Sequence, residues 1–297
     1  MARNSGNRTS YVKVRDFHLT HTMECGQLFR YRRVGDWYYV HSGNKFFKIR
    51  QGEGRLEFSG ADKDFIRHFF SLDVPMEDVL SEIPLDKHTR RAFRLYYGLR
   101  IIRQDPWECL LSYLCSIASN IPKIQRCLDG LARAFGEEVR LDEVKGYSLP
   151  GPSRDRPSGL STLDRAKALS LLKGLGLGFR SRYVYEVSQR VDNAYLESLR
   201  DLSYLEAKKK LMELPGVGEK VADCVLLFSL DFVGAFPVDR WIDRAIRTFY
   251  FKGKKVSPRE VQSFVSNHFG RYGGYAQQYL FHYSRTTLGR DFFQERK

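Results

Sequence analysis

The distribution of hydrophobic and polar positions divides the chain near residue 60. From Tyr11 to Gly60, short segments rich in aromatic and β-branched residues alternate with turn pairs such as Gly35-Asp36 and Gly43-Asn44. Alternation of this kind, bounded by glycine-containing turns, predicts an antiparallel meander of strands.

From Asp62 onward the apolar residues recur at helical spacing, and after Pro75 this pattern continues almost to the end of the chain. The sequence therefore predicts an α+β fold with two parts. An antiparallel sheet domain occupies residues 1–90, and an all-helical domain occupies residues 91–297. The cleft between the parts is the expected place for an active site.

One stretch of the helical part carries especially clear signals. Ser203 and Glu206 form an S-x-x-E capping box, and the apolar residues that follow predict a helix over about 205–213. Pro215 ends this helix, and a second, mostly apolar helix begins at Glu219. The pattern over residues 205–230 predicts a helix-hairpin-helix.

The turn of this hairpin contains Gly216 and Gly218. Glycine permits a tight turn and a close approach of the backbone to another surface. The unpaired N–H groups at the start of a helix, together with its dipole, suit a phosphate group. Because nothing in the turn contacts a base, the hairpin predicts sequence-independent binding to a nucleic-acid backbone.

Three residues in and after the second helix suggest chemistry. Lys220 lies in the first helical turn, where the dipole and the nearby amides disfavour an ammonium, and a neutral lysine amine is a nucleophile. Cys224 follows at i+4 and shares a face with it. Asp239 immediately precedes another helical pattern, which predicts an N-cap carboxylate.

Composition limits the partners and the cofactors. The net charge of +14 indicates an anionic partner, for which nucleic acid is the default. The five cysteines form no C-x-x-C pair, which suits a reducing compartment, and they are Cys25, Cys109, Cys115, Cys127 and Cys224. Only one follows residue 127, so a four-cysteine iron-sulfur loop after Asp239 is excluded by count.

No apolar run has membrane-spanning length, and the first residues lack the apolar core of a signal peptide. We therefore expect an intracellular protein without a membrane partner, in the cytoplasm or nucleoid of a prokaryote or the nucleus of a eukaryote. We also expect it to be a monomer without a cofactor.

Several further motifs occur in a characteristic order. They are CGQLFR at 25–30, RLYYGLRIIRQDPWECLLSYLCS at 94–116, GLGLGFRSRYV at 174–184, LPGVGEKVADC at 214–224 with PVD at 237–239, and GYAQQYLF at 274–281. Together they resemble the eukaryotic-type 8-oxoguanine DNA glycosylase/AP lyase branch of the helix-hairpin-helix (HhH-GPD) DNA glycosylases. The resemblance covers most of the chain.

This resemblance implies a bifunctional repair enzyme of base excision repair that acts on double-stranded DNA containing 8-oxoguanine. By the resemblance, Lys220 attacks C1′ of the flipped nucleotide and Asp239 stabilises the developing positive charge. It implies no catalytic metal, but a cation held by the hairpin carbonyls when DNA is bound.

The resemblance also assigns the base-binding residues. Gly26 offers its main-chain carbonyl to the N7–H that 8-oxoguanine has and guanine lacks. Cys224 and Phe281 sandwich the base, and Gln277 contacts its Watson–Crick edge. From local pattern alone, Gly26 would be a strand entry or bulge and Phe281 a core residue.

The segment after the helix that begins at Asp105 resembles the family's DNA-wedging loop but departs from it. Where eukaryotic members carry three asparagines, this chain has Ala118, Ser119 and Asn120, and Lys123 replaces an arginine that contacts the orphaned cytosine. Arg180 matches the family's other cytosine-facing arginine. We therefore expect DNA contacts from Asn120, Lys123 and Arg180, with a weakened preference for cytosine opposite the lesion.

Three alternatives remain open at this level. An alkylpurine glycosylase would keep Asp239 but would need no Lys220. An enzyme acting on oxidised pyrimidines would usually carry the iron-sulfur loop. A non-catalytic DNA-binding protein would use Lys220 as an exposed lysine at a helix start and Asp239 as a plain N-cap.

Overall fold

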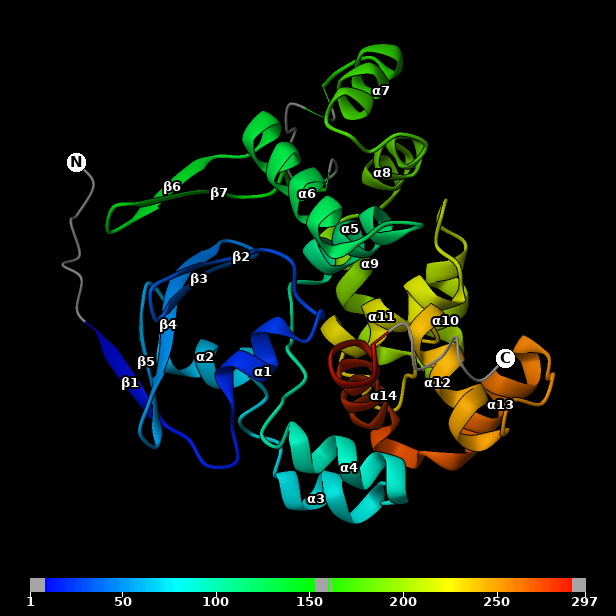
Figure 1. Cartoon of the computed structure of the whole chain (residues 1–297). Coiled ribbons are helices and arrows are strands. Elements are labelled where there is room, and N and C mark those ends of the chain that lie inside the picture. Colours follow the sequence, from blue (N-terminus) through cyan, green and yellow to red (C-terminus); the bar gives the residue numbers. More distant parts are fainter. Residues whose placement is uncertain (1–8, 153–159, 161, 290–297) are drawn as a thin grey trace.

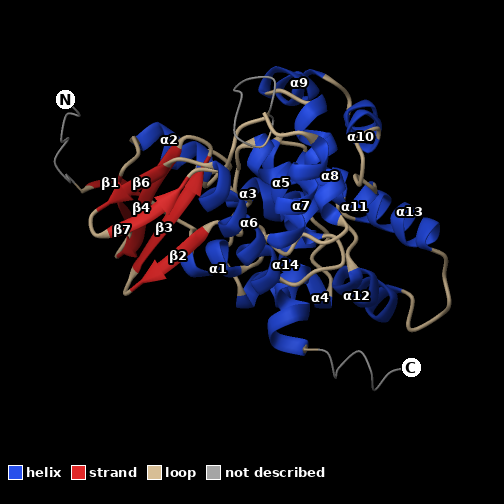
Figure 2. Ribbon diagram, turned by 90° about the horizontal axis from the view of Figure 1, so that it is seen from above, coloured by secondary structure: helices blue, strands red, loops and turns tan. Residues whose placement is uncertain are grey.

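The strands lie at one end of the molecule and most of the helices at the other (Figure 2). The computed structural model describes residues 9–152, 160 and 162–289. The predicted order, an N-terminal antiparallel sheet followed by a helical body, is confirmed (Figure 1).

A five-stranded sheet forms the N-terminal part. Its strands are β1 (Ser10–Lys13), β2 (Tyr31–Val34), β3 (Trp37–Ser42), β4 (Lys45–Gly52) and β5 (Arg55–Ser59). They are ordered β1-β5-β4-β3-β2 and every pairing is antiparallel, with Tyr38 opposite Ile49 and Ile49 opposite Phe58. Strands β2 to β5 form the predicted meander, and β1 adds to its free edge beside β5.

One face of this sheet is apolar because inward residues alternate along each strand. This face packs against two short helices, α1 (Leu19–Glu24) and α2 (Lys63–Phe69). The buried core of this part includes Val40, Phe47, Ile49, Leu56, Phe58, Ile66, Phe69 and Phe70. The chain of α1 leads directly into the loop that holds Gly26, so the sheet core fixes where that loop can lie.

The helical body contains the remaining long elements. They are α3 (Met76–Glu82), α4 (Lys87–Leu95), α5 (Pro106–Ser116), α6 (Ile121–Phe135), α7 (Arg165–Gly174), α8 (Arg180–Arg190), α9 (Asn193–Ser198), α10 (Tyr204–Met212), α11 (Glu219–Ser229), α12 (Arg240–Tyr250), α13 (Pro258–His268) and α14 (Gly273–Tyr283). Helix α11 packs on α5 and α10, and α14 packs on α4 and α12. These helices share one large apolar core.

Helices α3 and α4 contribute to the core of the helical body and not to that of the sheet, through residues such as Met76, Val79 and Phe93. The division of the chain at residue 90 stays a prediction. The core membership of these two helices places them with the helical body.

One expectation about the helical part is wrong. The segment after α6 forms a two-stranded antiparallel sheet of β6 (Glu138–Leu141) and β7 (Val144–Tyr147), and β6 lies close to β4 (Figure 1). Strands of four residues carry too little alternation to be distinguished from a loop. They are stabilised by tertiary contacts, such as Tyr39 Oη donating to Asp142 over 2.9 Å.

None of the helices in the described residues is both long enough and apolar enough to traverse a lipid bilayer. All five cysteines are buried free thiols.

Candidate active site

The helix-hairpin-helix is confirmed at the predicted residues. Helix α10 begins at a reciprocal capping box, in which Ser203 accepts from the Glu206 amide and Glu206 accepts from the Ser203 amide. Gly218 is the N-cap residue of helix α11, and no side chain of the described residues caps this helix. The first turn of α11 therefore presents backbone N–H groups to whatever lies outside the hairpin.

The two turn glycines serve different purposes. Gly216 has φ of +81°, the left-handed region, and a Cβ there would lie 2.5 Å from Cγ of Tyr183. Gly218 has φ of −94° and ψ of −179°, an extended conformation open to any residue, and a Cβ there would meet nothing within 4 Å. Gly216 is needed by the fold, whereas Gly218 keeps the outer face of the turn free for a partner.

This difference predicts a matched pair of stability effects. Gly216→Ala should lower the free energy of unfolding by about 2–4 kcal/mol, because left-handed strain and overpacking against Tyr183 add together. Gly218→Ala should change it by less than about 1 kcal/mol. Urea denaturation of both variants checks this, and equal losses would contradict it.

A cavity of about 400 Å³ lies between the sheet-side loop and the helical body. It is within the size range of small-molecule sites. Its lining includes all six residues predicted for catalysis and base binding, namely Gly26, Lys220, Cys224, Asp239, Gln277 and Phe281. These residues span most of the chain, and the fold brings them together in one pocket.

Lys220 is half-buried at this cavity. Its Nζ lies 4.7 Å from the centroid of the Tyr113 ring and 3.3 Å from Ser116 Oγ, to which it donates a hydrogen bond. Tyr113 is itself fixed, since its Oη donates to the carbonyl of Gln27 over 3.1 Å. The amine is thus held over an aromatic face at the edge of the pocket rather than extended into solvent.

Asp239 is both a helix cap and a wall of the cavity. Its Oδ1 accepts from the amides of Trp241 over 2.9 Å and Ile242 over 2.8 Å. Burial raises the pKa of the Asp239 carboxyl above its ordinary value, while the Ile242 amide and the positive charge of Lys220 act in the opposite direction. Both predicted roles, N-cap and partner of Lys220, fit one carboxylate.

Cys224 and Phe281 also line the cavity. The Cys224 side chain is 2% exposed, and burial raises the pKa of its thiol to about 12, so the sulfur is a neutral, polarisable surface. Phe281 lies on α14, and its Cε1 would be 3.2 Å from a Cβ on Gly26. Gly26 has φ of +90°, so a side chain there would be strained and would also enter the cavity.

The loop that carries Gly26 is fixed by hydrogen bonds from distant segments. Gln278 Nε2 donates to the Cys25 carbonyl over 3.1 Å, and Gln104 Nε2 donates to the Gln27 carbonyl over 2.8 Å. The buried Gln27 side chain in turn donates to the Arg100 carbonyl over 2.8 Å. Sequence analysis did not identify these glutamines, because nothing local distinguishes a buried glutamine that orients a loop from an exposed one.

Gln277 is 4% exposed, and one of the two polar groups of its side-chain amide is already hydrogen-bonded within the protein. Its Nε2 donates to the Pro237 carbonyl over 3.1 Å, an assignment fixed by the carbonyl, which can only accept. Its Oε1 is buried and has no hydrogen-bond partner among the described residues. A buried acceptor at a cavity wall indicates a ligand with a donor edge.

Of the three predicted DNA-contact residues, Asn120 lines this cavity. Asn120 is exposed, and its Oδ1 caps α6 by accepting from the Lys123 amide over 3.0 Å. Arg180 is 3% exposed, and its guanidinium donates to the carbonyls of Ile117 and Ala118. Contact of Arg180 with DNA stays a prediction, since the structure uses this guanidinium to hold the wedge loop.

Phe179 is an exposed aromatic that sequence analysis did not single out. It precedes α8 and is 55% exposed, in edge-to-face contact with Tyr183 beside the hairpin glycine. Aromatic rings at a nucleic-acid surface can stack on bases, so the exposed ring suits a DNA partner. The signal in the sequence was an aromatic at the first turn of a basic helix.

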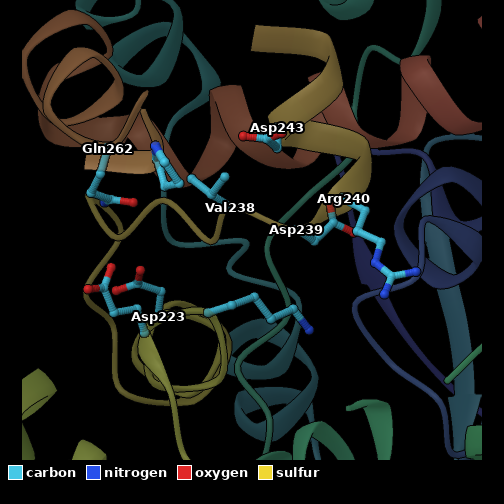
Figure 3. A pocket seen from close by; sticks show the side chains of 9 residues that line it. Asp223, Val238, Asp239, Arg240, Asp243 and Gln262 are labelled. Carbon is cyan, nitrogen blue, oxygen red and sulfur yellow. The ribbon is translucent and has the colours of Figure 1, made fainter. Parts of the chain in front are cut away.

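A second pocket of about 300 Å³ lies on the hairpin side of Lys220 and Asp239. Figure 3 shows Asp223 on α11 across from Asp243 on α12 and from Asp239, the N-cap residue of α12. Asp223 is 1% exposed and is bonded by Lys208 over 3.0 Å, which ties α10 to α11. In the described residues no cluster of three or more His, Cys, Asp or Glu side chains could hold a metal ion.

Comparison with known proteins identifies the family. The family model of the 8-oxoguanine DNA glycosylase N-terminal domain matches residues 11–110. The N-glycosylase/DNA lyase OGG1 of Arabidopsis thaliana is 32% identical over 310 residues, covering 93% of this chain and 81% of that protein. The chain belongs to the 8-oxoguanine DNA glycosylase family.

Solved structures agree with this membership. MBOgg1 in complex with a low-affinity DNA ligand matches with a TM-score of 0.87 at 30% identity, covering 95% of this chain and 96% of that one. The 8-oxoguanine glycosylase/lyase of Clostridium acetobutylicum, in complex with DNA containing cytosine opposite 8-oxoguanine, matches with a TM-score of 0.83 at 27% identity, covering 93% and 97%. The resemblance and the fold predicted from the sequence are thereby confirmed.

Proposed function

We propose that this member of the 8-oxoguanine DNA glycosylase family excises 8-oxoguanine from double-stranded DNA and then cleaves the strand as an AP lyase. The observation that carries this is that Lys220 and Asp239 line one cavity, with the Lys220 amine held over the Tyr113 ring. A base can reach these groups only after rotation out of the duplex, because C1′ is inaccessible inside the stack.

The chemistry follows from these two groups. The nitrogen of Lys220 attacks C1′, the C1′–N9 bond breaks, and the electron pair of that bond leaves with the base. Asp239, ionised and close to the sugar, stabilises the positive charge that develops there. The C1′–O4′ bond of the resulting aminal then breaks, O4′ gains a proton and the nitrogen loses one, which gives an imine that permits β-elimination of the 3′ phosphate.

The amide of Gln277 supports a guanine-type substrate. With Nε2 committed to the Pro237 carbonyl, the free Oε1 is an acceptor. The Watson–Crick edge of 8-oxoguanine presents N1–H and N2–H donors, whereas adenine presents an acceptor at N1. A base with the wrong edge would leave a buried acceptor facing another acceptor, which disfavours adenine-type lesions.

Discrimination between 8-oxoguanine and guanine is assigned to the Gly26 carbonyl, which would accept from N7–H. The Gln278 and Gln104 bonds hold this loop in place, which favours such a single-atom distinction. DNA is held by the hairpin amides and by the wedge loop. The protein acts as a monomer within the cell and needs no cofactor.

The direct test is borohydride trapping on duplexes that carry one lesion each: 8-oxoguanine, a formamidopyrimidine, an alkylated purine or an oxidised pyrimidine. We expect efficient covalent trapping on 8-oxoguanine and little on the alkylated purine or oxidised pyrimidine. Trapping on an oxidised pyrimidine with none on 8-oxoguanine would refute the proposed substrate.

The wedge loop predicts a weak opposite-base preference. Ala118 has no hydrogen-bonding side chain, Lys123 provides a single ammonium in place of a bidentate fork, and Arg180 is occupied by loop carbonyls. Excision rates with C, T, G and A opposite the lesion should fall within about tenfold of one another, since one bidentate contact is worth about 1–3 kcal/mol. Single-turnover rates on the four duplexes check this, and a steep preference for cytosine would contradict it.

A further inference from the structure

We propose that Arg285 is a further specificity-determining residue of the base pocket, whose guanidinium donates a hydrogen bond to the 8-oxo oxygen of the flipped base. The same contact stabilises negative charge on the base as it leaves. This inference rests on the proposed function of the cavity as the site of 8-oxoguanine.

Arg285 is carried into the cavity by the end of α14. Gln277, Phe281 and Arg285 follow one another at intervals of four residues, and all three line the same cavity. After Tyr283 the helix continues as a π-helical turn, Ser284–Leu288. Such π turns are uncommon and occur frequently at functional sites.

The π turn is held by hydrogen bonds at its outer side. Thr286 Oγ1 donates to the His282 carbonyl over 2.6 Å, and Tyr96 Oη lies 2.6 Å from Thr286 Oγ1 and 2.7 Å from Thr287 Oγ1. The backbone beside Arg285 is therefore fixed. Its side chain has a defined direction rather than a range of surface positions.

The guanidinium is only partly used by the protein. One terminal nitrogen, Nη2, donates to the Glu24 carbonyl over 2.7 Å, and Cζ lies 5.5 Å from the centroid of the Phe281 ring. Its Nε is buried and has no partner among the described residues. The cationic group of Arg285 therefore keeps one buried, unused donor beside the cavity.

The order of residues along α14 indicates which edge of the base this donor meets. Gln277 is assigned to the N1 and N2 edge, and Gly26, which would place a Cβ 3.8 Å from Arg285 Cζ, is assigned to N7. Going round a purine, O6 lies between N1 and N7, whereas O8 lies beyond N7. Arg285 follows Phe281 by four residues in the chain, and its guanidinium is a close neighbour of Gly26, so we assign it to O8, the acceptor next to N7.

The positive charge of Arg285 suits the departure of the base as an anion. When the C1′–N9 bond breaks and the bond from Lys220 Nζ to C1′ forms, the electron pair of the broken bond moves onto the purine and is shared with O8. A guanidinium donor at O8 stabilises that anion without transferring a proton. The proton released by the attacking amine then returns the base to its neutral form.

The test uses Arg285→Met in the full-length protein, with single-turnover excision measured on 8-oxoguanine and on 8-thioguanine, which keeps N7–H but has a weaker acceptor at position 8. We expect Arg285→Met to slow excision of 8-oxoguanine by roughly 10- to 100-fold, as loss of a hydrogen bond to a charged group does. The wild-type preference for the oxygen over the sulfur base should shrink by a similar factor. β-Elimination at a preformed abasic site, which contains no base, should stay within about threefold.

Two further variants separate this role from a structural one. Arg285→Gln keeps a donor for the Glu24 carbonyl without the charge, so it should remain slow on 8-oxoguanine; full restoration would mean that Arg285 only fixes the loop. Arg91→Met removes an exposed arginine of α4 that lies over Tyr283, a residue of α14. This variant should leave excision and β-elimination unchanged.

Equal slowing of 8-oxoguanine and 8-thioguanine excision, or a parallel loss of β-elimination, would overturn the role of Arg285. If the wild-type protein itself fails to excise 8-oxoguanine, the proposed function fails, and the inference about Arg285 fails with it. The two failures are therefore distinguished by the wild-type control.

Discussion

Lys220→Gln should lower excision of 8-oxoguanine and strand cleavage by roughly 10⁴- to 10⁶-fold, the effect expected when a covalent nucleophile is removed. A glutamine amide has about the same reach but no basic lone pair, so no imine can form at C1′. Borohydride trapping should disappear. Lesion-containing DNA should still bind, because the hairpin amides and the cavity walls remain.

The matched control is Lys209→Gln, which removes an exposed lysine from α10 of the same hairpin. It should retain full cleavage, with at most a small change in DNA affinity that depends on salt concentration. Gel-shift titration and single-turnover cleavage distinguish the two variants. Persistent trapping by Lys220→Gln would refute the assignment of the nucleophile and would favour a non-catalytic DNA-binding protein.

Asp239→Asn has the second-largest expected effect. The rate of excision should fall by about 10²- to 10³-fold, because the ionised carboxylate that stabilises the sugar cation is replaced by a neutral amide. Asparagine caps a helix as well as aspartate does, so α12 should stay intact and the free energy of unfolding should not fall by more than about 1 kcal/mol.

In the wild-type protein, the carboxyl of Asp239 should make both stability and the rate of excision depend on pH, each with a definite sign. Burial raises the pKa of Asp239 above 3.8, so the protonated form is favoured in the folded state relative to the unfolded one. The group therefore contributes most to stability at pH below the unfolded pKa, and that contribution is lost as pH rises through the folded pKa. Catalysis needs the ionised carboxylate instead. The rate of wild-type excision should therefore decline as pH falls, and the midpoint of this decline should lie above pH 3.8.

In Asp239→Asn the rate of excision should no longer decline at low pH (the acid limb of the pH profile), because an amide does not titrate in that range. Rates measured from about pH 4 to pH 8, with stability followed over the same range, check both parts. An unchanged acid limb in the variant would mean that another group governs it. A large loss of stability would mean that the carboxylate acts mainly as a cap.

The hairpin illustrates what the sequence determines locally. The capping box of Ser203 and Glu206, the proline that ends α10 and the left-handed Gly216 act within a few residues, so their effect does not depend on the rest of the fold. The same holds for Asp239 as an N-cap. These local signals are sufficient to assign Lys220 to the start of one helix and Asp239 to the start of the next.

The short β6–β7 hairpin and the wedge loop show where local pattern is insufficient. Each β6 and β7 strand has four residues and is stabilised through contacts with the distant sheet. Tertiary structure also gives the guanidinium of Arg180 a role that the sequence did not indicate, since it donates to carbonyls 62 and 63 residues earlier in the chain. A buried and an exposed arginine look alike in a sequence.

The base pocket itself was decided only by tertiary structure. The sequence, with its family resemblance, supplied Gly26, Lys220, Asp239 and Gln277 as candidates, and they do line one cavity. It did not supply the Gln278 bond to Cys25 across 253 residues, or the unpaired acceptor of Gln277. Helix caps and turns depend on neighbouring residues and can be predicted from them. The orientation of a buried amide depends on contacts with residues far away in the chain: the remote Pro237 carbonyl binds Nε2 of Gln277 and leaves its Oε1 without a partner among the described residues.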